Sequence, residues 1–328
     1  MDPLRNLFLN NAGRLRSGWR LITFTGLFVI LMFVATGALR VVYALAINLV
    51  PTLAPREHFE DLIFRLMFLG GALVAGYICT RFIEGLPWRS LGLTCHSSWL
   101  RDLSLGSGIG VVSLALAAAI AFAGGGLRFS VSPKPLGSVA GTVVISAGLF
   151  IVAALAEEAL FRGYPLQTLT RARLIWLGIL LTSVPFAAIH LKNPNAGGVL
   201  AFINTALAGV WLAVAYLRTR SLWFPLGVHW AWNWALGALF GLPVSGITKI
   251  APNPILLGSD FGPAWLTGAR YGIEGGVACT IALVISTIFI WRTGLVSATD
   301  DLKQLTSQEN PATANSGVSP QTVAEFSP

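Results

Sequence analysis

Six polar residues in the middle of this sequence have the types and spacings needed for acid–base chemistry. They are Glu157, Glu158, Arg162, His190, His229 and Asn233. Each lies in or beside a stretch that is otherwise almost entirely apolar. An ionisable side chain within a membrane-spanning stretch costs at least ~2.5–3.5 kcal/mol on insertion scales, so such residues are candidates for function. Their joint occurrence, rather than any single residue, predicts a chemical site.

The spacing of the first three residues gives them different positions on one helix. Glu158 and Arg162 are four residues apart, so they share a helix face and can form an ion pair. Pairing makes the burial of both charges tolerable, and a purely structural clamp is one interpretation of this pair. Glu157 is rotated by about 100° from Glu158, so it points toward a different cavity and suits the role of general base.

The histidines have equally specific neighbours. His229 and Asn233 are four residues apart, so one helix face presents an imidazole and a carboxamide, both able to donate hydrogen bonds to a developing oxyanion. His190 follows Pro185 and Phe186, and it is placed to help Glu157 hold a water molecule or to bind a metal. The competing interpretation is that each histidine is an ordinary packing residue.

The order of these residues resembles a known family. The motifs EExxxR (157–162), FxxxH (186–190) and HxxxN (229–233) are similar to the three motifs of the CPBP, or Abi, intramembrane proteases. This family includes CAAX prenyl endopeptidases of the Ras-converting enzyme type and bacteriocin-immunity proteins. Each motif alone is weak, whereas three in order on separate apolar segments are fairly specific. The resemblance implies a family domain at about 140–240 and an eight-helix architecture.

The resemblance implies an intramembrane endopeptidase that acts on membrane-associated protein or peptide substrates, with prenylated CAAX proteins as one substrate class. Glu157 would activate a water with help from His190, and His229 and Asn233 would stabilise the oxyanion. Glu158 and Arg162 would order the site. The alternatives are a non-enzymatic bacteriocin-immunity or membrane scaffold protein, and a proton-coupled transporter, because intramembrane Glu and His also form proton relays.

The metal requirement stays open at this point. Glu157, His190 and His229 are plausible zinc ligands. Their spacing is not HExxH, however, and the adjacent glutamates also fit water activation without a metal. Zinc and no cofactor therefore both remain possible, with the metal-free interpretation slightly favoured.

Composition identifies the elements that must position these residues. Charged residues make up 11% of the 328 residues, and the mean hydropathy is +0.71. A soluble domain carries about 25% charged residues. We therefore expect an all-α, polytopic transmembrane bundle of about eight spans. The expected spans are 21–45, 62–83, 103–123, 139–160, 174–191, 199–217, 222–240 and 271–291.

The formal net charge of +8 does not indicate a nucleic-acid partner. The basic residues lie in short breaks between apolar runs, where a lipid bilayer and the positive-inside rule account for them. The loops expected on the same side of the membrane as the N-terminus contain twice as many Lys and Arg residues as the loops on the other side. This bias predicts a multi-pass cell-membrane protein with both termini in the cytoplasm. The three cysteines are too scattered for a disulfide framework or a thiolate metal site.

The chain is expected to divide into six regions. They are a basic interfacial segment (1–20), N-terminal transmembrane helices (21–135), a CPBP-like core (136–240), a Gly/Pro-rich loop (241–270), a last transmembrane helix (271–297) and a disordered polar tail (298–328). With these boundaries Glu157 lies near the end of its span, whereas His190 lies about 24 Å from the same membrane side. A common site requires tilt, a kink at Pro185 or different boundaries.

Overall fold

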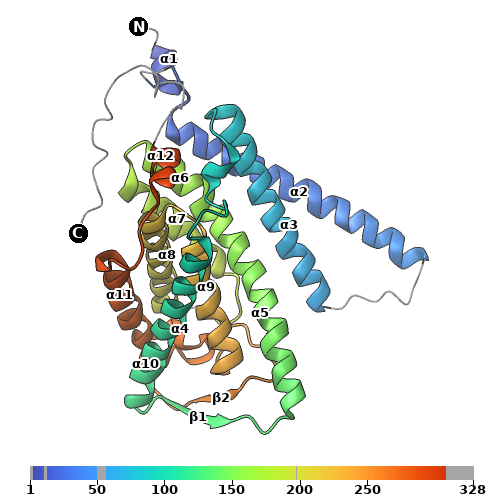
Figure 1. The fold of residues 1–328 in the computed structure, drawn as a ribbon. Helices are drawn as coiled ribbons and strands as arrows, with labels where there is room; N and C mark the ends of the chain where they lie inside the picture. Colours follow the sequence, from blue (N-terminus) through green and yellow to red (C-terminus); the bar gives the residue numbers. More distant parts are fainter. Residues whose placement is uncertain (1–2, 11–12, 50–56, 197, 308–328) are drawn as a thin grey trace.

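Most apolar runs of the sequence form helices in the computed structural model, which describes residues 3–10, 13–49, 57–196 and 198–307 (Figure 1). Among these described residues, five helical stretches are long and apolar enough to cross a membrane. They contain α2 (Ser17–Leu49), α3 (Glu57–Ile78), α4 (Trp99–Ala123), α5 (Leu136–Glu158) and α8 (Val199–Thr219). This confirms the predicted all-α transmembrane fold.

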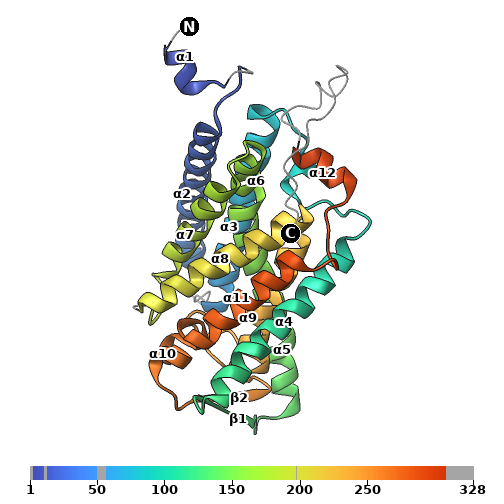
Figure 2. The same ribbon diagram turned by 90° about the vertical axis from the view of Figure 1, so that its left-hand side faces the viewer.

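Three shorter helices complete the predicted set of about eight spans. They are α7 (Ile175–His190), α9 (Trp223–Trp234), which is extended by a π-turn at Ala235–Leu239, and α11 (Val277–Arg292). In Figures 1 and 2, α9 runs through the middle of the bundle, with α4, α5 and α8 beside it. The helices α2 and α3 pair with each other and diverge from the other helices toward the end where the strands lie (Figure 1).

The helix that carries the two adjacent glutamates is longer than the sequence indicates. After α5 the backbone passes through a π-turn at Ala159–Gly163 into α6 (Tyr164–Arg171). The expected span end at residue 160 is therefore wrong, and Glu157 lies well inside a helical stretch that runs from Leu136 to Arg171. The charge of Arg162 suggested an end, but pairing with Glu158 lets the helix continue through it.

Small residues bring α4 and α9 into close contact. A Cβ atom on Gly106 would lie 2.3 Å from the carbonyl oxygen of Phe224, and one on Gly110 would lie 2.4 Å from that of Val228. Glycines four residues apart are a common way for membrane helices to approach closely. This contact fixes the position of α9, which carries His229 and Asn233.

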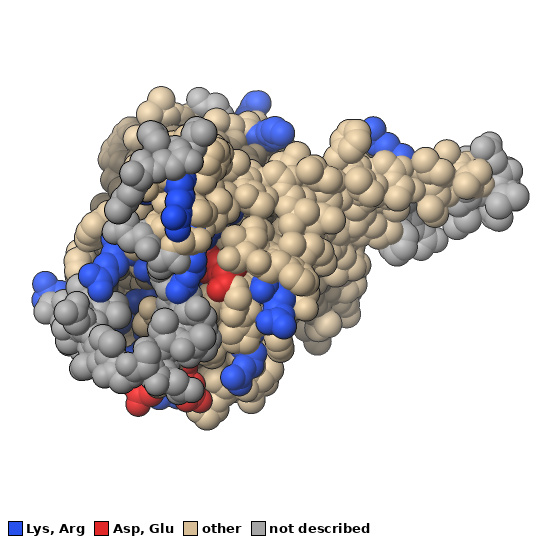
Figure 3. All heavy atoms as spheres, turned by 90° about the horizontal axis from the view of Figure 1, so that it is seen from above, with Lys and Arg blue, Asp and Glu red and all other residues tan. Residues whose placement is uncertain are grey.

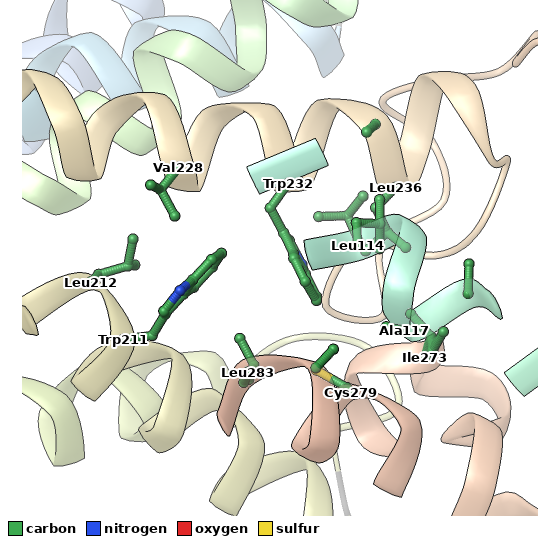
Figure 4. Close-up of a cluster of buried hydrophobic side chains, with 14 of the residues drawn as sticks. Leu114, Ala117, Trp211, Leu212, Val228, Trp232, Leu236, Ile273, Cys279 and Leu283 are labelled. Atoms are coloured by element: carbon green, nitrogen blue, oxygen red, sulfur yellow. The ribbon is translucent and has the colours of Figure 1, made fainter. Parts of the chain in front are cut away.

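Aromatic side chains fill the core on the other side of α9. Figure 4 shows Trp211 and Trp232 beside Leu283 and Cys279, in a cluster that joins α8, α9 and α11. The two indole rings meet edge to face, with centroids 5.5 Å apart. The helices that carry the candidate site are thus held by packing on both sides of α9.

The helical bundle also contains one small sheet that was not predicted. Strands β1 (Leu127–Val131) and β2 (Leu256–Asp260) pair antiparallel, with Leu127 opposite Asp260. The sheet ties the Gly/Pro-rich loop to the connection between α4 and α5. The short elements α10 (Ala264–Thr267), Ala269–Tyr271 and Ile273–Gly275 follow it and lead into α11.

The first and last of the described helices lie at the opposite end of the bundle from the sheet (Figure 1). Helix α1 (Pro3–Phe8) lies there, together with α12 (Asp300–Ser307), where the sequence predicted a disordered tail. That prediction is wrong for these eight residues: Leu302 and Thr306, one turn apart, are buried. Residues 308–328 lie outside the described residues.

This end of the molecule carries more basic than acidic side chains (Figure 3). That is the charge pattern which the positive-inside rule associates with a cytoplasmic face. The orientation of the chain stays a prediction.

Candidate active site

The six predicted site residues come from three helical segments and converge around α9. Glu157 and Glu158 end α5, Arg162 lies in the π-turn that follows, and His190 is the last residue of α7. His229 and Asn233 are one turn apart on α9. Because α5 continues through the π-turn into α6, Glu157 and Glu158 lie inside a long helical stretch and not at its end.

A fully buried ion pair forms the back of the site. Arg162 donates from Nη1 to Oε1 of Glu158 at 3.0 Å, and both side chains are 0% exposed. The same guanidinium donates from Nη2 to the carbonyl oxygen of Gly209 at 3.1 Å and lies 4.7 Å from the centroid of the Phe186 ring. Arg162 therefore links the end of α5 to α7 and α8.

His229 lies between the two adjacent glutamates. Its Nδ1–H donates to Oε1 of Glu158 at 2.8 Å, which leaves Nε2 on the side of Glu157, 3.7 Å from Oε2. A hydrogen bond at one ring nitrogen fixes the orientation of the ring and the role of the other nitrogen. The geometry thus presents Nε2 of His229 and the Glu157 carboxylate to each other without a direct hydrogen bond.

Glu157 differs from Glu158 in its surroundings. Its side chain is 21% exposed, and its Oε2 has no hydrogen-bond partner among the described residues. The rotation of about 100° per residue explains this difference, because it turns one carboxylate into the bundle and the other toward a cavity. Glu157 lines that cavity, as the spacing predicted.

His190 is oriented by its own helix. Its Nδ1–H donates to the carbonyl oxygen of Phe186 at 2.7 Å, so Nε2 carries the lone pair when the ring is neutral. The Phe186 ring lies between the two histidines, with centroids 4.7 Å from His190 and 6.0 Å from His229. The phenylalanine of the FxxxH motif therefore contacts both histidines and the Arg162 guanidinium.

Two adjoining cavities meet at the site. The larger has a volume of about 370 Å³ and is lined by side chains of α3, α5, the end of α7 and the loop after α9, with Glu157 in its wall. The smaller has a volume of about 40 Å³ and is lined by His229, Trp232 and Glu274 among others. Three residues line both cavities, namely His190, Asn233 and Ser245.

Two of these lining residues were missed by the sequence analysis. Glu274 lies in the expected span 271–291, so the criterion that selected Glu157 would also have selected it. Ser245 gave no such signal, because a serine in a Gly/Pro-rich loop is unremarkable until the loop is folded against the site.

The candidate metal ligands do not form a metal-binding group. Within residues 3–10, 13–49, 57–196 and 198–307, no cluster of three or more His, Cys, Asp or Glu side chains is placed to hold a metal ion. The residues as arranged do not fit a zinc centre, and we derive no step through a metal.

Fold and site together define a membrane-embedded helical protein with a buried polar centre, and comparison with known proteins shows what the segment around that centre resembles. Residues 139–235 match the family model described as type II CAAX prenyl endopeptidase Rce1-like. The matched residues include all three motifs, and the match confirms the resemblance to the CPBP, or CAAX protease, family.

The chain is also similar to a protein of Escherichia coli described as an uncharacterized 24.3 kDa protein. The two are 36% identical over 107 residues, which cover 32% of this chain and 47% of that protein. The chain thus spans about half the length of the curated relative that it matches.

Proposed function

We propose that this protein is an intramembrane endopeptidase that hydrolyses peptide bonds of membrane-associated substrates. The observation that carries the proposal is the position of Glu157, whose carboxylate lies in the cavity wall 3.7 Å from Nε2 of His229. A general base must reach the proton that it removes, directly or through one water. The larger cavity, which Glu157, His190 and Asn233 all line, has a volume of about 370 Å³ and so has room for a water, which needs about 10–15 Å³.

In the proposed reaction, Glu157 accepts a proton from a water that attacks the carbonyl carbon of the scissile bond. His190 assists by accepting a hydrogen bond from that water at Nε2. The proton held by Glu157 then passes to the leaving amine as the carbon–nitrogen bond breaks. Removing such a general base typically lowers the rate 10²- to 10⁴-fold.

The oxyanion of the tetrahedral intermediate is proposed to accept hydrogen bonds from the Asn233 carboxamide and the His229 imidazole. Donation by His229 uses Nε2, since Nδ1–H is bonded to Glu158. His229 therefore acts as a donor when both ring nitrogens carry protons. Glu158 and Arg162 hold this ring and the helix end in place, and they do not contact the substrate.

The lining of the larger cavity favours an apolar or lipid-anchored substrate. Three aromatic side chains of α3 and α5, Phe64, Phe68 and Phe150, line this cavity, together with the Asp61–Arg65 ion pair of α3. Prenylated CAAX peptides are one substrate class of this kind.

The decisive experiment compares purified wild-type protein with Glu157→Gln in lipid, using a fluorogenic membrane-anchored peptide with and without a prenyl group. Glu157→Gln should lose 10²–10⁴-fold in cleavage rate with an unchanged melting temperature, because the removed charge has no hydrogen bond at Oε2. The matched control is Glu60→Gln on the exposed surface of α3. Full activity of Glu157→Gln would refute its assigned role.

Two further measurements refine the same proposal. Treatment with phenanthroline followed by Zn²⁺ should leave the cleavage rate unchanged, and restoration of a lost rate by Zn²⁺ would contradict metal-free water activation. Substrate trapping with Glu157→Gln should enrich membrane proteins that the wild-type protein cleaves. If cleavage is absent in the wild type and the motif variants keep the cellular phenotype, the protein is a non-enzymatic member of its family.

A further inference from the structure

Glu274 is a third carboxylate beside the site, and both of its carboxylate oxygens accept hydrogen bonds. Its Oε1 accepts from Nε1 of Trp232 at 3.0 Å. Its Oε2 accepts from the backbone N–H of Ser245 at 2.5 Å and from the Ser245 hydroxyl at 3.2 Å. Its own backbone is fixed, because Asn204 donates from Nδ2 to the carbonyl oxygens of Glu274 and Gly276 at 2.8 and 2.9 Å.

Ser245 lies in a tight turn that its side chain does not favour. Val244 and Ile247 exchange two backbone hydrogen bonds of 2.9 Å, and the residues between them, Ser245 and Gly246, have φ values of 48° and 82°. Positive φ at both central positions defines a type I′ hairpin turn, which prefers Asn-Gly or Gly-Gly. A serine in the left-handed region is strained and needs support from its surroundings.

The same turn is wedged against the chain that follows His190. The N–H of Gly246 donates to the carbonyl oxygen of Tyr271 at 2.9 Å. A Cβ atom on Gly246 would lie 1.9 Å from the carbonyl oxygen of Pro194, so only glycine fits there. Tyr271, Pro194 and Glu274 therefore all contact the turn. Of these three, Glu274 bonds to the strained residue of the turn, Ser245.

The turn forms the wall where the two cavities meet. Ser245 lines both cavities together with His190 and Asn233, and Val244, Ile247 and Ile250 line the larger one. A shift of the turn would change the shape of the space beside His190 and Asn233, whereas the contacts among Glu158, Arg162 and His229 would persist.

We propose that Glu274 is a positioning residue, which holds the Ser245–Gly246 turn as a wall of the substrate cavity and so sets how tightly the substrate binds. This proposal rests on the proposed endopeptidase function for its kinetic consequence. The chemistry stays with Glu157 and His229, and Glu274 acts on the substrate through the turn.

The test begins with Glu274→Gln, which keeps the size of the side chain. In glutamine an NH₂ group replaces one of the two carboxylate oxygens, so a donor would face either the Trp232 indole N–H or the Ser245 donors, and the bonds at both former oxygens cannot be kept. We expect KM for the membrane-anchored peptide to rise about tenfold or more while kcat changes less than about threefold. An unchanged KM, or an equal loss in kcat and kcat/KM, would overturn the proposal.

A second-site variant separates this role from general destabilisation. In Glu274→Gln/Ser245→Gly, glycine adopts the positive φ without strain, so the turn should form without its carboxylate and KM should fall back toward that of the wild type. Failure of the double variant to recover KM would show that Glu274 acts otherwise. Should Glu274→Gln not fold, Ser245→Ala, which removes only the hydroxyl contact, should raise KM in the same direction, and no rise would count against the proposal.

Hydrogen exchange provides a readout that does not depend on catalysis. Amide exchange in residues 241–255 should be faster in Glu274→Gln than in the wild type and slower again in the double variant, with exchange in α4 and α9 unchanged. Equal exchange in all three proteins would refute the positioning role. A wild-type protein that cleaves nothing would refute the proposed function instead, so the two failures are distinguishable.

Discussion

Two buried clusters of carboxylates and arginines include residues of the same helical stretch, Leu136–Arg171, and they differ in charge balance. At the end of α6, one carboxylate, Glu84, meets two arginines: Arg171 bonds to its Oε2 and Arg20 lies 3.5 Å from its Oε1. At the end of α5 there are two carboxylates and one arginine: Glu158 pairs with Arg162 and with Nδ1 of His229, whereas Glu157 lies 3.7 Å from Nε2 of His229.

The two clusters also differ in whether their carboxylate oxygens accept hydrogen bonds. Both oxygens of Glu84 accept hydrogen bonds, one from Thr168 and one from Arg171. By contrast, Oε2 of Glu157 and Oε2 of Glu158 have no hydrogen-bond partner among the described residues. A cluster whose carboxylate is fully hydrogen-bonded stabilises the fold, whereas the unsatisfied carboxylate of Glu157, which lines a cavity, remains able to accept a proton or a ligand.

The comparison predicts that the Glu84 cluster carries stability and not chemistry. Glu84→Ala would remove the carboxylate that pairs with the buried Arg171 guanidinium, which should cost about 3–5 kcal/mol in the free energy of unfolding. Cleavage activity per folded molecule should be retained. The measurement is denaturation in detergent paired with activity normalised to folded protein, and a loss of specific activity as large as that of Glu157→Gln would break the comparison.

The pair behind the site should show coupling between its two members. Arg162→Met leaves Glu158 buried without its cation, whereas Glu158→Gln/Arg162→Met leaves no uncompensated charge. Removing one partner of a buried pair costs more stability than replacing both partners. The free energy of unfolding of the double variant should therefore exceed that of Arg162→Met by at least about 1 kcal/mol. A double variant that is less stable by the sum of both single effects would mean that Glu158 and Arg162 act independently.

The smallest expected effect is a pH dependence from Glu84. Burial raises the pKa of this carboxyl, but Arg171, the Thr168 hydroxyl and Arg20 outweigh burial and hold the pKa below its ordinary value of 4.5. Because the folded-state pKa is lowered, its stabilisation is complete above about pH 4.5 and is lost as the pH falls through the folded-state pKa.

Thermal unfolding at a series of pH values from 3 to 7 tests this prediction. The wild-type protein should lose stability in the acid range, and Glu84→Gln should show a flatter profile there. Parallel profiles for the two proteins would show that Glu84 does not carry the acid sensitivity.

Sequence alone predicted the helical membrane fold and the main contents of the site. The scarcity of charge defined the spans, and the few intramembrane polar residues were recognisable because apolar neighbours surround them. The spacing of Glu157, Glu158 and Arg162 predicted which carboxylate pairs with the arginine and which faces a cavity, because helix geometry is local and fixed.

Helix ends and loops were predicted less well. The charge of Arg162 suggested the end of a span, although its pairing with Glu158 allows the helix to continue to Arg171. The strand pair β1–β2 joins segments that are more than a hundred residues apart. The turn at Ser245 depends on Glu274, which is nearly thirty residues away. Local sequence patterns do not encode such contacts.

The sequence by itself therefore determined that this is a polytopic helical protein with a Glu–Glu–Arg helix face and two intramembrane histidines. Only the tertiary structure decided that Nδ1 of His229 bonds to Glu158 while Nε2 faces Glu157, and that Glu274 holds the turn beside them. The physical reason is that residue type and helical period fix which side chains share a face. The distances between faces depend on how closely whole helices pack, as Gly106 and Gly110 allow α4 and α9 to do.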